Sequence, residues 1–162
     1  MTLMDDELRS FNLALAGIQG LYHEACVRLG LSDSASHVLY SLAMFGEGCT
    51  PRDVYRSFGV SRQTVHSAVS VLVRQGIVFL QKGPGRGQRI YLTEKGHALV
   101  RARIVPLISL ENALLGSWPE EDRRELLRLL RKYRDDLRGR LPALKPEAET
   151  ARPALADAGE QQ

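Results

Sequence analysis

The sequence of 162 residues contains no long uncharged apolar run, because Arg, Lys, Asp, Glu or Pro interrupts every candidate. A membrane-spanning helix needs about 18 such residues or more. The first ten residues, MTLMDDELRS, carry acids where a secretory signal would carry basic residues followed by an apolar segment. We therefore expect a cytoplasmic protein with no membrane partner.

Cysteine is also scarce, since Cys26 and Cys49 are the only two in the chain. They lie too far apart for a CxxC motif, and they are too few for a disulfide framework. We expect both to be reduced and to behave as small apolar side chains.

Positive charge is concentrated in the middle of a chain whose net charge is only +3. Residues 52–103 contain ten Arg or Lys residues against Asp53 and Glu94, a balance of +8, whereas the remaining residues sum to −5. The hydrophobic content of 44% and the charged content of 25% are those of an ordinary globular protein, and the length suits one domain with helical extensions. The cationic middle predicts a polyanionic partner.

Helical periodicity begins early in the chain. Apolar residues at helical spacing from Leu8 to Leu29 predict a long amphipathic helix that stops near Gly30. Ser32 or Ser34 can cap a second helix, which ends at residues 46–48. We expect its inward residues to be Val38, Leu39, Leu42 and either Met44 or Phe45.

Two shorter helices with strong start and stop signals follow. Thr50 can cap the first, Pro51 suits its first turn, and Gly59 lets the chain turn at its end. Ser61 can cap the second, which ends near Gln75. The expected inward residues are Val54 and Phe58 in the first helix and Val65, Ala68, Val69 and Leu72 in the second. Helix, tight glycine-containing turn and helix together are the helix-turn-helix signature.

After Gly76 the apolar pattern changes from a period of about 3.6 to a period of two. Residues 77–82 and 88–92 alternate as strands do, and the stretch GPGRG separates them. Two strands joined by such a tip predict a β-hairpin. A hairpin directly after a helix-turn-helix is a wing, so we expect a mainly α-helical (α+β) winged helix-turn-helix fold.

Helical patterns return after the wing. Thr93 begins a helix that Pro106 should bend rather than end, because helical periodicity continues on both sides of it. Ser117 and Glu120 have the spacing of a capping box for a last helix. The apolar residues of that helix are Leu126, Leu130, Tyr133 and Leu137. Beyond Arg140 the composition turns to Pro, Ala, Glu and Gln, which predicts a disordered tail.

The outward face of the predicted helix that starts after Ser61 carries no Asp or Glu. A solvated helix face usually mixes both signs of charge, whereas polar side chains of moderate length suit a DNA groove. The free N–H groups at the helix start also favour a phosphate. We expect contacts with double-stranded DNA from this helix and from the wing, through Ser61, Arg62, Gln63, Thr64, His66, Ser67, Ser70, Arg74, Arg86 and Arg89.

The order of these motifs resembles the MarR family of bacterial winged-helix transcription regulators. The likeness covers roughly residues 8–140, through SRQTVHSAVSVLVRQGIV, the Gly/Arg hairpin, IYLTEKGHAL and the long helices on both sides, and the run LTEKG is its most specific part. It implies a homodimer that reads a pseudo-palindromic operator, and a small lipophilic or anionic effector that releases the DNA. It also implies that Arg86 enters the minor groove, although Gly83, Pro84 and Gly85 stand where the family often has an aspartate that braces this arginine.

The sequence thus predicts four segments. These are a dimerisation helix over 1–31, a winged helix-turn-helix DNA-binding lobe over 32–93, dimerisation helices over 94–141 and a disordered tail over 142–162. The long flanking helices form the dimerisation layer because their apolar faces exceed what a small core can cover.

We therefore predict a homodimeric DNA-binding repressor that a small effector releases, with no cofactor and no metal site. No catalytic residues are expected, because the chain has no Ser, His and Asp arrangement, paired carboxylates or nucleophile elbow. Three alternatives remain. His23, Cys26 and His37 lie in the region where some zinc-sensing relatives place their ligands, although the HxxxH pair of those relatives is absent. Cys26 could sense oxidants. The winged fold could also serve as a protein-interaction module without DNA binding, which the acid-free helix face disfavours.

Overall fold

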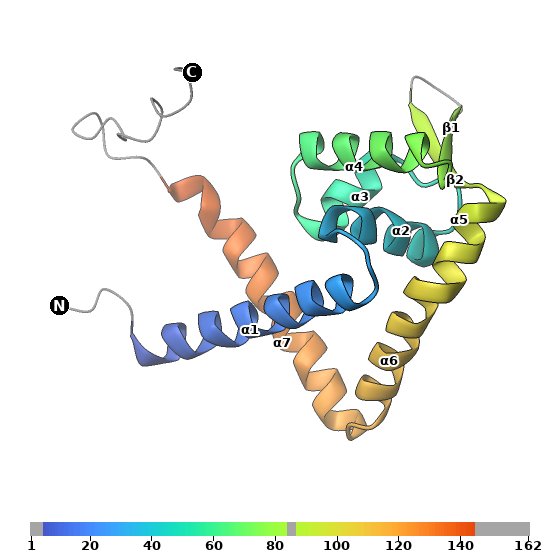
Figure 1. The fold of residues 1–162 in the computed structure, drawn as a ribbon. Helices are drawn as coiled ribbons and strands as arrows, with labels where there is room; N and C mark the ends of the chain where they lie inside the picture. Colours follow the sequence, from blue (N-terminus) through green and yellow to red (C-terminus); the bar gives the residue numbers. More distant parts are fainter. Residues whose placement is uncertain (1–4, 84–86, 145–162) are drawn as a thin grey trace, which may run out of the picture. The chain divides into compact units, whose positions relative to one another are not determined.

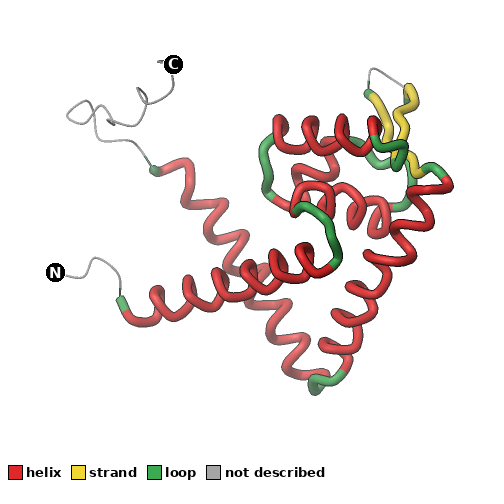
Figure 2. The backbone as a smooth tube through the Cα atoms, in the orientation of Figure 1, coloured by secondary structure: helices red, strands yellow, loops and turns green. Residues whose placement is uncertain are grey.

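The computed structural model of the protein describes residues 5–83 and 87–144 (Figure 1). The chain divides into two compact units, Met1–Leu114 and Leu115–Gln162. Its elements, in chain order, are α1 (Asp6–Arg28), α2 (Asp33–Phe45), α3 (Pro51–Phe58), α4 (Arg62–Arg74), β1 (Val78–Lys82), β2 (Gln88–Leu92), α5 (Glu94–Leu99), the π-helical turn η1 (Val100–Ile104), α6 (Val105–Gly116), α7 (Glu120–Arg140) and the 3₁₀ turn η2 (Leu141–Ala143). Figure 2 shows helices throughout the described residues and strands in one hairpin. The predicted fold class, a mainly α-helical winged helix-turn-helix between long helices, is confirmed. Within the described ranges, no helix has both the length and the apolar character that a membrane crossing requires.

The helix starts predicted in the first unit are confirmed. Ser32, Thr50, Ser61 and Thr93 are the N-caps of α2, α3, α4 and α5, and each side-chain oxygen accepts a hydrogen bond from a backbone N–H of the first turn. At α3 the cap is reciprocal, because Asp53 also accepts from the Thr50 backbone N–H at 2.7 Å. This hydrogen bond and a second from the Thr50 hydroxyl hold the pKa of Asp53 below its ordinary value.

The core of the winged lobe is built from one face of each helix and strand. The fully buried side chains include Val38 and Leu39 of α2, Val54 of α3 and Leu72 of α4. Val65, Ala68 and Val69 of α4 join them, as do Val78 of β1 and Ile90 of β2. All of these helical positions were predicted to face inward, which confirms the periodicity argument for α2, α3 and α4.

The end of α2 departs from that expectation. Met44 and Phe45 are 53% and 51% exposed, so the prediction that one of them faces the core is wrong. The chain turns at Gly46, where φ is +83°, and returns along the hairpin. Cys49 then forms an isolated bridge with Ile90 and completes the core at this place, because it is only 6% exposed.

The wing is an antiparallel hairpin in which Val78 pairs with Leu92 and Lys82 with Gln88. Val78, Ile90 and Leu92 are buried while Phe79 and Gln88 are exposed, as expected for strands with one face on a core. The Gly83 N–H donates to the Gly87 carbonyl at 3.0 Å and closes the hairpin below its tip. The tip itself, residues 84–86, lies outside the described residues.

A tight junction joins the end of α4, the start of the wing and the start of α5. The Thr93 hydroxyl donates to the carbonyl of Gly76 at 2.6 Å, and the Thr93 N–H donates to that of Ile77 at 3.0 Å. Lys95 donates through Nζ to the Gln75 carbonyl at 2.8 Å, at the end of α4. Gly96 packs so closely that an added Cβ would lie 2.1 Å from the Ile77 carbonyl oxygen. Only glycine fits there, which gives the LTEKG run a structural reason.

The helix that begins at Glu94 continues through Pro106, as predicted, but a π-helical turn precedes the proline. Within it the Val105 N–H donates to the Val100 carbonyl. A proline ring clashes with the carbonyl four residues earlier, and a wider turn ahead of it relieves that clash. Arg103 in this turn donates through Nη1 to the carbonyls of Leu29 and Gly30, at 2.7 and 2.9 Å. It therefore ties the end of α1 to the turn.

In the second unit, α7 begins later than the sequence suggested. Pro119 is its N-cap position, with no side-chain cap, so the prediction that Ser117 caps this helix through a capping box is wrong. A helix capped by Ser117 would require helical dihedrals at Trp118, and a residue before proline disfavours them. Every residue of α7 is exposed or only half-buried, including Leu127, Leu129 and Leu130.

The Gly96→Ala substitution should destabilise the folded protein by about 2 kcal/mol or more, because the new methyl group must displace backbone at the junction. Gly17→Ala in α1 is the matched control, since its added Cβ meets nothing within 4 Å. A glycine within a helix loses more backbone entropy on folding than alanine does, so Gly17→Ala should be neutral or more stable by about 0.5–1 kcal/mol. Urea unfolding followed by circular dichroism measures both, and equal midpoints for the two variants would contradict the packing argument.

Candidate nucleic-acid interface and adjoining cavity

The start of α4 is a capped helix end that is exposed to solvent. The Ser61 Oγ accepts from the Thr64 N–H at 3.0 Å and lies 2.8 Å from the Thr64 hydroxyl. The cap fixes where α4 begins, and both residues are exposed to solvent. The unpaired N–H groups of the first turn and the helix dipole together favour an anion at this end.

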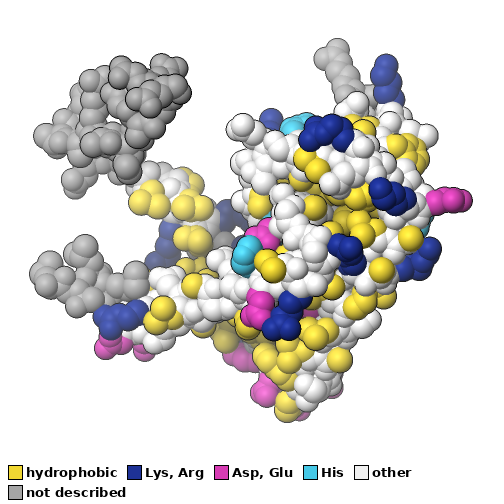
Figure 3. Space-filling view, in the orientation of Figure 1, with side chains coloured by type: hydrophobic (Ala, Val, Ile, Leu, Met, Phe, Trp, Pro, Cys, Tyr) yellow, Lys and Arg dark blue, Asp and Glu magenta, His cyan; other side chains and the backbone are white. Residues whose placement is uncertain are grey.

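The structure brings the predicted helix residues together on one side of α4. All are exposed, while Val65, Val69 and Leu72 on the opposite side are at most 3% exposed. The residues on this exposed side are Arg62, Gln63, Thr64, His66, Ser67, Ser70 and Arg74. Figure 3 shows Lys and Arg side chains over the lobe that carries α4. A polar helix face with donors and no acids is suited to phosphates and base edges.

Arg62 is positioned by a contact that the sequence did not suggest. Its guanidinium carbon lies 5.3 Å from the centre of the Tyr55 ring on α3. A cation over an aromatic face is attracted to the ring, and the contact restricts the rotamers of a long side chain. Tyr55 thus holds Arg62 at the edge of the exposed face.

Of the two arginines predicted in the wing, the structure describes Arg89 and not Arg86. Arg86 lies outside the described residues. Arg89 is half-buried, and its Nη1 donates to the Gly48 carbonyl at 2.8 Å. A Cβ on Gly83 would lie 2.5 Å from the Arg89 Nε, so this glycine makes room for the arginine. Arg89 is therefore held against its own lobe, apart from the exposed face of α4.

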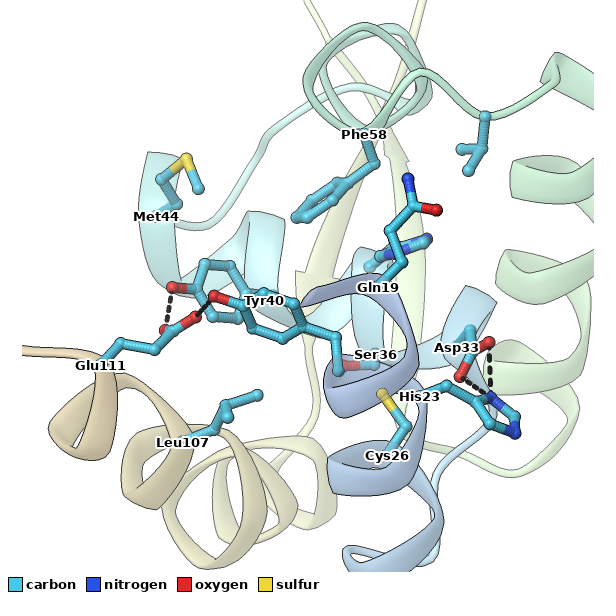
Figure 4. Close-up of a pocket in the computed structure, with 13 residues that line it drawn as sticks. Gln19, His23, Cys26, Asp33, Ser36, Tyr40, Met44, Phe58, Leu107 and Glu111 are labelled. Atoms are coloured by element: carbon cyan, nitrogen blue, oxygen red, sulfur yellow. Dashed lines mark hydrogen bonds and ion pairs between the residues drawn. The ribbon is translucent and has the colours of Figure 1, made fainter. Parts of the chain in front are cut away.

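A cavity of about 610 Å³ lies beside the helix-turn-helix (Figure 4). Residues of α1, α2 and α6 form most of its wall, and Phe58 and Val60 contribute the segment that leads from α3 into α4. The sequence did not predict the residues of this cavity, because they come from distant parts of the chain. The one feature of the sequence that could have indicated a polar site here is Glu111, the only charged residue between Arg103 and Glu120.

Two tyrosine hydroxyls meet one carboxylate in the cavity. Tyr22 of α1 donates to Glu111 Oε1 at 2.7 Å, and Tyr40 of α2 donates to Glu111 Oε2 at 2.5 Å. The hydrogen bond to Glu111, together with burial, raises the pKa of Tyr22 to about 12. Burial, with the hydrogen bond to Glu111, also raises the pKa of Tyr40. Both phenols therefore stay protonated donors near neutral pH.

Two histidines occupy other parts of the wall. His37 stacks on Phe58 with ring centres 4.4 Å apart, and its buried Nδ1 has no hydrogen-bond partner among the described residues. Burial lowers the pKa of His37, so its ring is neutral near pH 7. His23 contacts both carboxylate oxygens of Asp33 through Nδ1, at 2.9 and 3.0 Å.

The geometry gives no support to metal or oxidant sensing. In the described part of the chain, no group of three or more His, Cys, Asp or Glu side chains could hold a metal ion. Cys26 and Cys49 are each 6% exposed. Burial raises the pKa of Cys26, and burial with nearby Asp53 raises that of Cys49 to about 11. A raised thiol pKa leaves little reactive thiolate at neutral pH.

The hairpin after α4, the exposed face of α4 and the long helices on both sides define a winged helix-turn-helix fold. The sequence model of the MarR family matches residues 29–89, from the end of α1 to the second strand of the wing. The resemblance to the MarR family that the sequence predicted is confirmed over these residues.

Solved structures share this fold at low sequence identity. A MarR family regulator from Neisseria meningitidis matches with a TM-score of 0.78 and 19% identity, over 87% of this chain and 100% of that one. The S. aureus MepR–DNA complex gives a TM-score of 0.64 and 20% identity, over 78% and 93%. PcaV from Streptomyces coelicolor, in complex with its natural ligand, gives 0.61 and 23%, over 83% and 98%. No curated protein matches the chain in sequence.

Both thiols of the folded protein should react with Ellman's reagent at least about tenfold more slowly than those of the urea-unfolded chain, because they are buried and their raised pKa values reduce the thiolate fraction. The variants Cys26→Ser and Cys49→Ser separate the two thiols in a stopped-flow measurement. Fast labelling of Cys26 in the folded Cys49→Ser variant would contradict this expected protection and would support oxidant sensing by Cys26.

Proposed function

We propose that the protein is a DNA-binding transcription repressor that reads a pseudo-palindromic operator as a homodimer. The observation that carries the proposal is the acid-free, solvent-exposed face of α4, whose first turn is capped by Ser61. In this proposal Gln63 and its neighbours contact base edges in the major groove. The same fold in the S. aureus MepR–DNA complex supports this reading. Such a repressor would act in the cytoplasm, where bacterial DNA lies.

Arg74 and Arg89 are assigned different parts in the proposal. Arg74, in the last turn of α4, is exposed and would meet a phosphate. Arg89 is bound to the Gly48 carbonyl and would shape the base of the wing, with any DNA contact made through its other guanidinium nitrogens. Arg86 would enter the minor groove at the wing tip, which the sequence alone suggests.

The homodimer part of the proposal is supported by apolar side chains that the single chain leaves exposed. In α1, Leu13, Leu21 and Val27 are each at least 62% exposed. In α7, Leu130 and Leu137 are each 44% exposed and fall on one helical stripe. Exposed apolar faces of this extent usually cover one another in an oligomer. We therefore assign α1, α6 and α7 to the dimerisation layer.

The release of DNA by an effector is supported by the position of the cavity. Phe58 ends α3 and Val60 lies in the turn before Ser61, and both line the cavity. A ligand seated there contacts the segment that sets the position of α4. It can therefore favour a placement of the two recognition helices that no longer matches DNA, provided that it binds this state more tightly. The ligand-bound structure of PcaV supports the presence of an effector in this fold.

In sequences selected from a random DNA pool, Gln63→Ala should relax the preference at one base position of each half-site and cost about 1–3 kcal/mol. Gln75→Ala is the matched control, because Gln75 is at the opposite end of α4 and its substitution should leave the selected sequence unchanged.

Arg86→Ala should instead weaken binding to all sequences and reduce the slope of log affinity against log salt concentration by about one. Failure of the parent protein to enrich any sequence would favour the interaction-module function.

The double substitution Leu130→Gln/Leu137→Gln should convert the dimer to a monomer at micromolar concentration, because it removes apolar side chains from the exposed stripe of α7. The double variant Arg131→Gln/Arg138→Gln changes the same helix without touching that stripe and should remain dimeric. Light scattering after size-exclusion chromatography measures the mass. A parent protein that is monomeric at this concentration would disprove the homodimer.

A further inference from the structure

The cavity beside the helix-turn-helix has an unusual balance of charge. Among the described residues, its lining contains the carboxylates of Asp33 and Glu111 and no Lys or Arg. Four rings also line it, those of Tyr22, His37, Tyr40 and Phe58. Its volume of about 610 Å³ suits a small organic molecule.

We propose that this cavity binds a small organic cation with an aromatic or apolar body, whose positive centre lies against Glu111 and the rings of Tyr22 and Tyr40. This inference rests on the proposed function, an effector-controlled repressor, and names the chemical class of the effector. It departs from the lipophilic or anionic effector that the family resemblance implied.

Glu111 is prepared for a cation by its two tyrosines. Each carboxylate oxygen accepts one phenol hydroxyl and keeps further acceptor capacity, because a carboxylate oxygen has two lone pairs. The two hydrogen bonds come from α1 and α2 and hold the carboxylate, which α6 carries, in one orientation (Figure 4). A charged group that is already oriented loses little entropy when a ligand binds.

The aromatic rings add a second attraction that anions and neutral molecules lack. A cation within about 6 Å of a ring centre is attracted to the negative face of the ring. The hydroxyls of Tyr22 and Tyr40 are hydrogen-bonded to Glu111, so one positive centre can contact the carboxylate and the phenol rings together. Phe58, stacked on His37, offers a flat apolar surface for the rest of the ligand.

An anionic ligand would find no Lys or Arg among the described residues that line the cavity. His37 is neutral near pH 7, because burial lowers its pKa. His23 is already bound through Nδ1 to the carboxylate of Asp33, so its ring lies against a negative group. The unpartnered Nδ1 of His37 gives a bound ligand one further hydrogen-bond site. The lining therefore repels carboxylates and attracts ammonium groups.

Three probes with the same two-ring body separate the effect of charge from that of shape. We would titrate the purified full chain, without DNA, with naphthylmethylammonium, naphthylmethanol and naphthylacetate by isothermal calorimetry. The ammonium should bind at least about tenfold more tightly than the alcohol, and naphthylacetate should bind most weakly. Equal affinities, tighter binding of naphthylacetate or no measurable binding of the ammonium would overturn the proposal. These three outcomes need no variant.

The substitution Glu111→Gln keeps the shape of the side chain and removes its charge. It should weaken the ammonium by about tenfold or more and leave the alcohol within about twofold, since only the charge interaction is lost. Glu94→Gln is the matched control, because Glu94 is exposed on α5 and does not line the cavity. Ammonium affinity that survives Glu111→Gln unchanged would overturn the assignment.

A separate measurement distinguishes failure of the proposed cation site from failure of the proposed DNA-binding function. Operator binding of the parent protein, measured without any probe, tests the DNA-binding function alone. A protein that binds an operator but prefers naphthylacetate would retain the function and disprove the cation site. A protein that binds the ammonium but no DNA would retain the site and disprove the repressor.

Discussion

The fit of Gly96 against the Ile77 carbonyl is the constraint on which the arrangement of the winged lobe depends. At this point the end of α4, the first residue of the wing and the start of α5 meet within hydrogen-bond distance, through Thr93 and Lys95. A side chain at Gly96 would separate the helix that presents the polar face from the hairpin and from the long helix that follows. At this junction the Lys95 ammonium group donates to the carbonyl of Gln75, the C-cap of α4, and the Thr93 hydroxyl donates to that of Gly76, just beyond it. A positive charge also suits the negative end of the helix dipole.

The lobe has two chemically different faces, and the segment from α3 to α4 belongs to both. On one side Tyr55 of α3 holds Arg62 over its ring, and on the other Phe58 stacks on His37 at the cavity. Phe58 packs against the buried core of the lobe, and because protein interiors are densely packed, a change at Phe58 is passed to neighbouring side chains. The positively charged helix face and the carboxylate-lined cavity thus attract ligands of opposite sign. This difference separates the proposed sites of the polyanion and the cation, so an effector would release DNA by shifting α4 and not by occupying the DNA site.

Local signals in the sequence predicted most of the fold because they act over a few residues. Capping side chains, glycines at helix ends and the change of period after Gly76 each concern one turn of helix or one strand. The same reasoning found the exposed face of α4, since Val65, Val69 and Leu72 fix which side is buried. It was wrong at Ser117, where the dihedral preference before Pro119 outweighed the capping pattern. It was also wrong that Met44 or Phe45 faces the core, because Cys49 completes the core there. The π-helical turn before Pro106 was not predicted, because it depends on how the proline ring is accommodated in a packed helix.

The sequence by itself determined the winged helix-turn-helix order, the residues exposed on α4 and the MarR resemblance, because periodicity and caps are properties of neighbouring residues. Only the tertiary structure decided the cavity, because Tyr22, Tyr40 and Glu111 lie on three different helices and no local pattern links them. It also decided that Arg62 rests on Tyr55 and that Arg89 binds the Gly48 carbonyl. A side chain can be read as polar from the sequence, but its partner is chosen by packing between segments far apart in the chain.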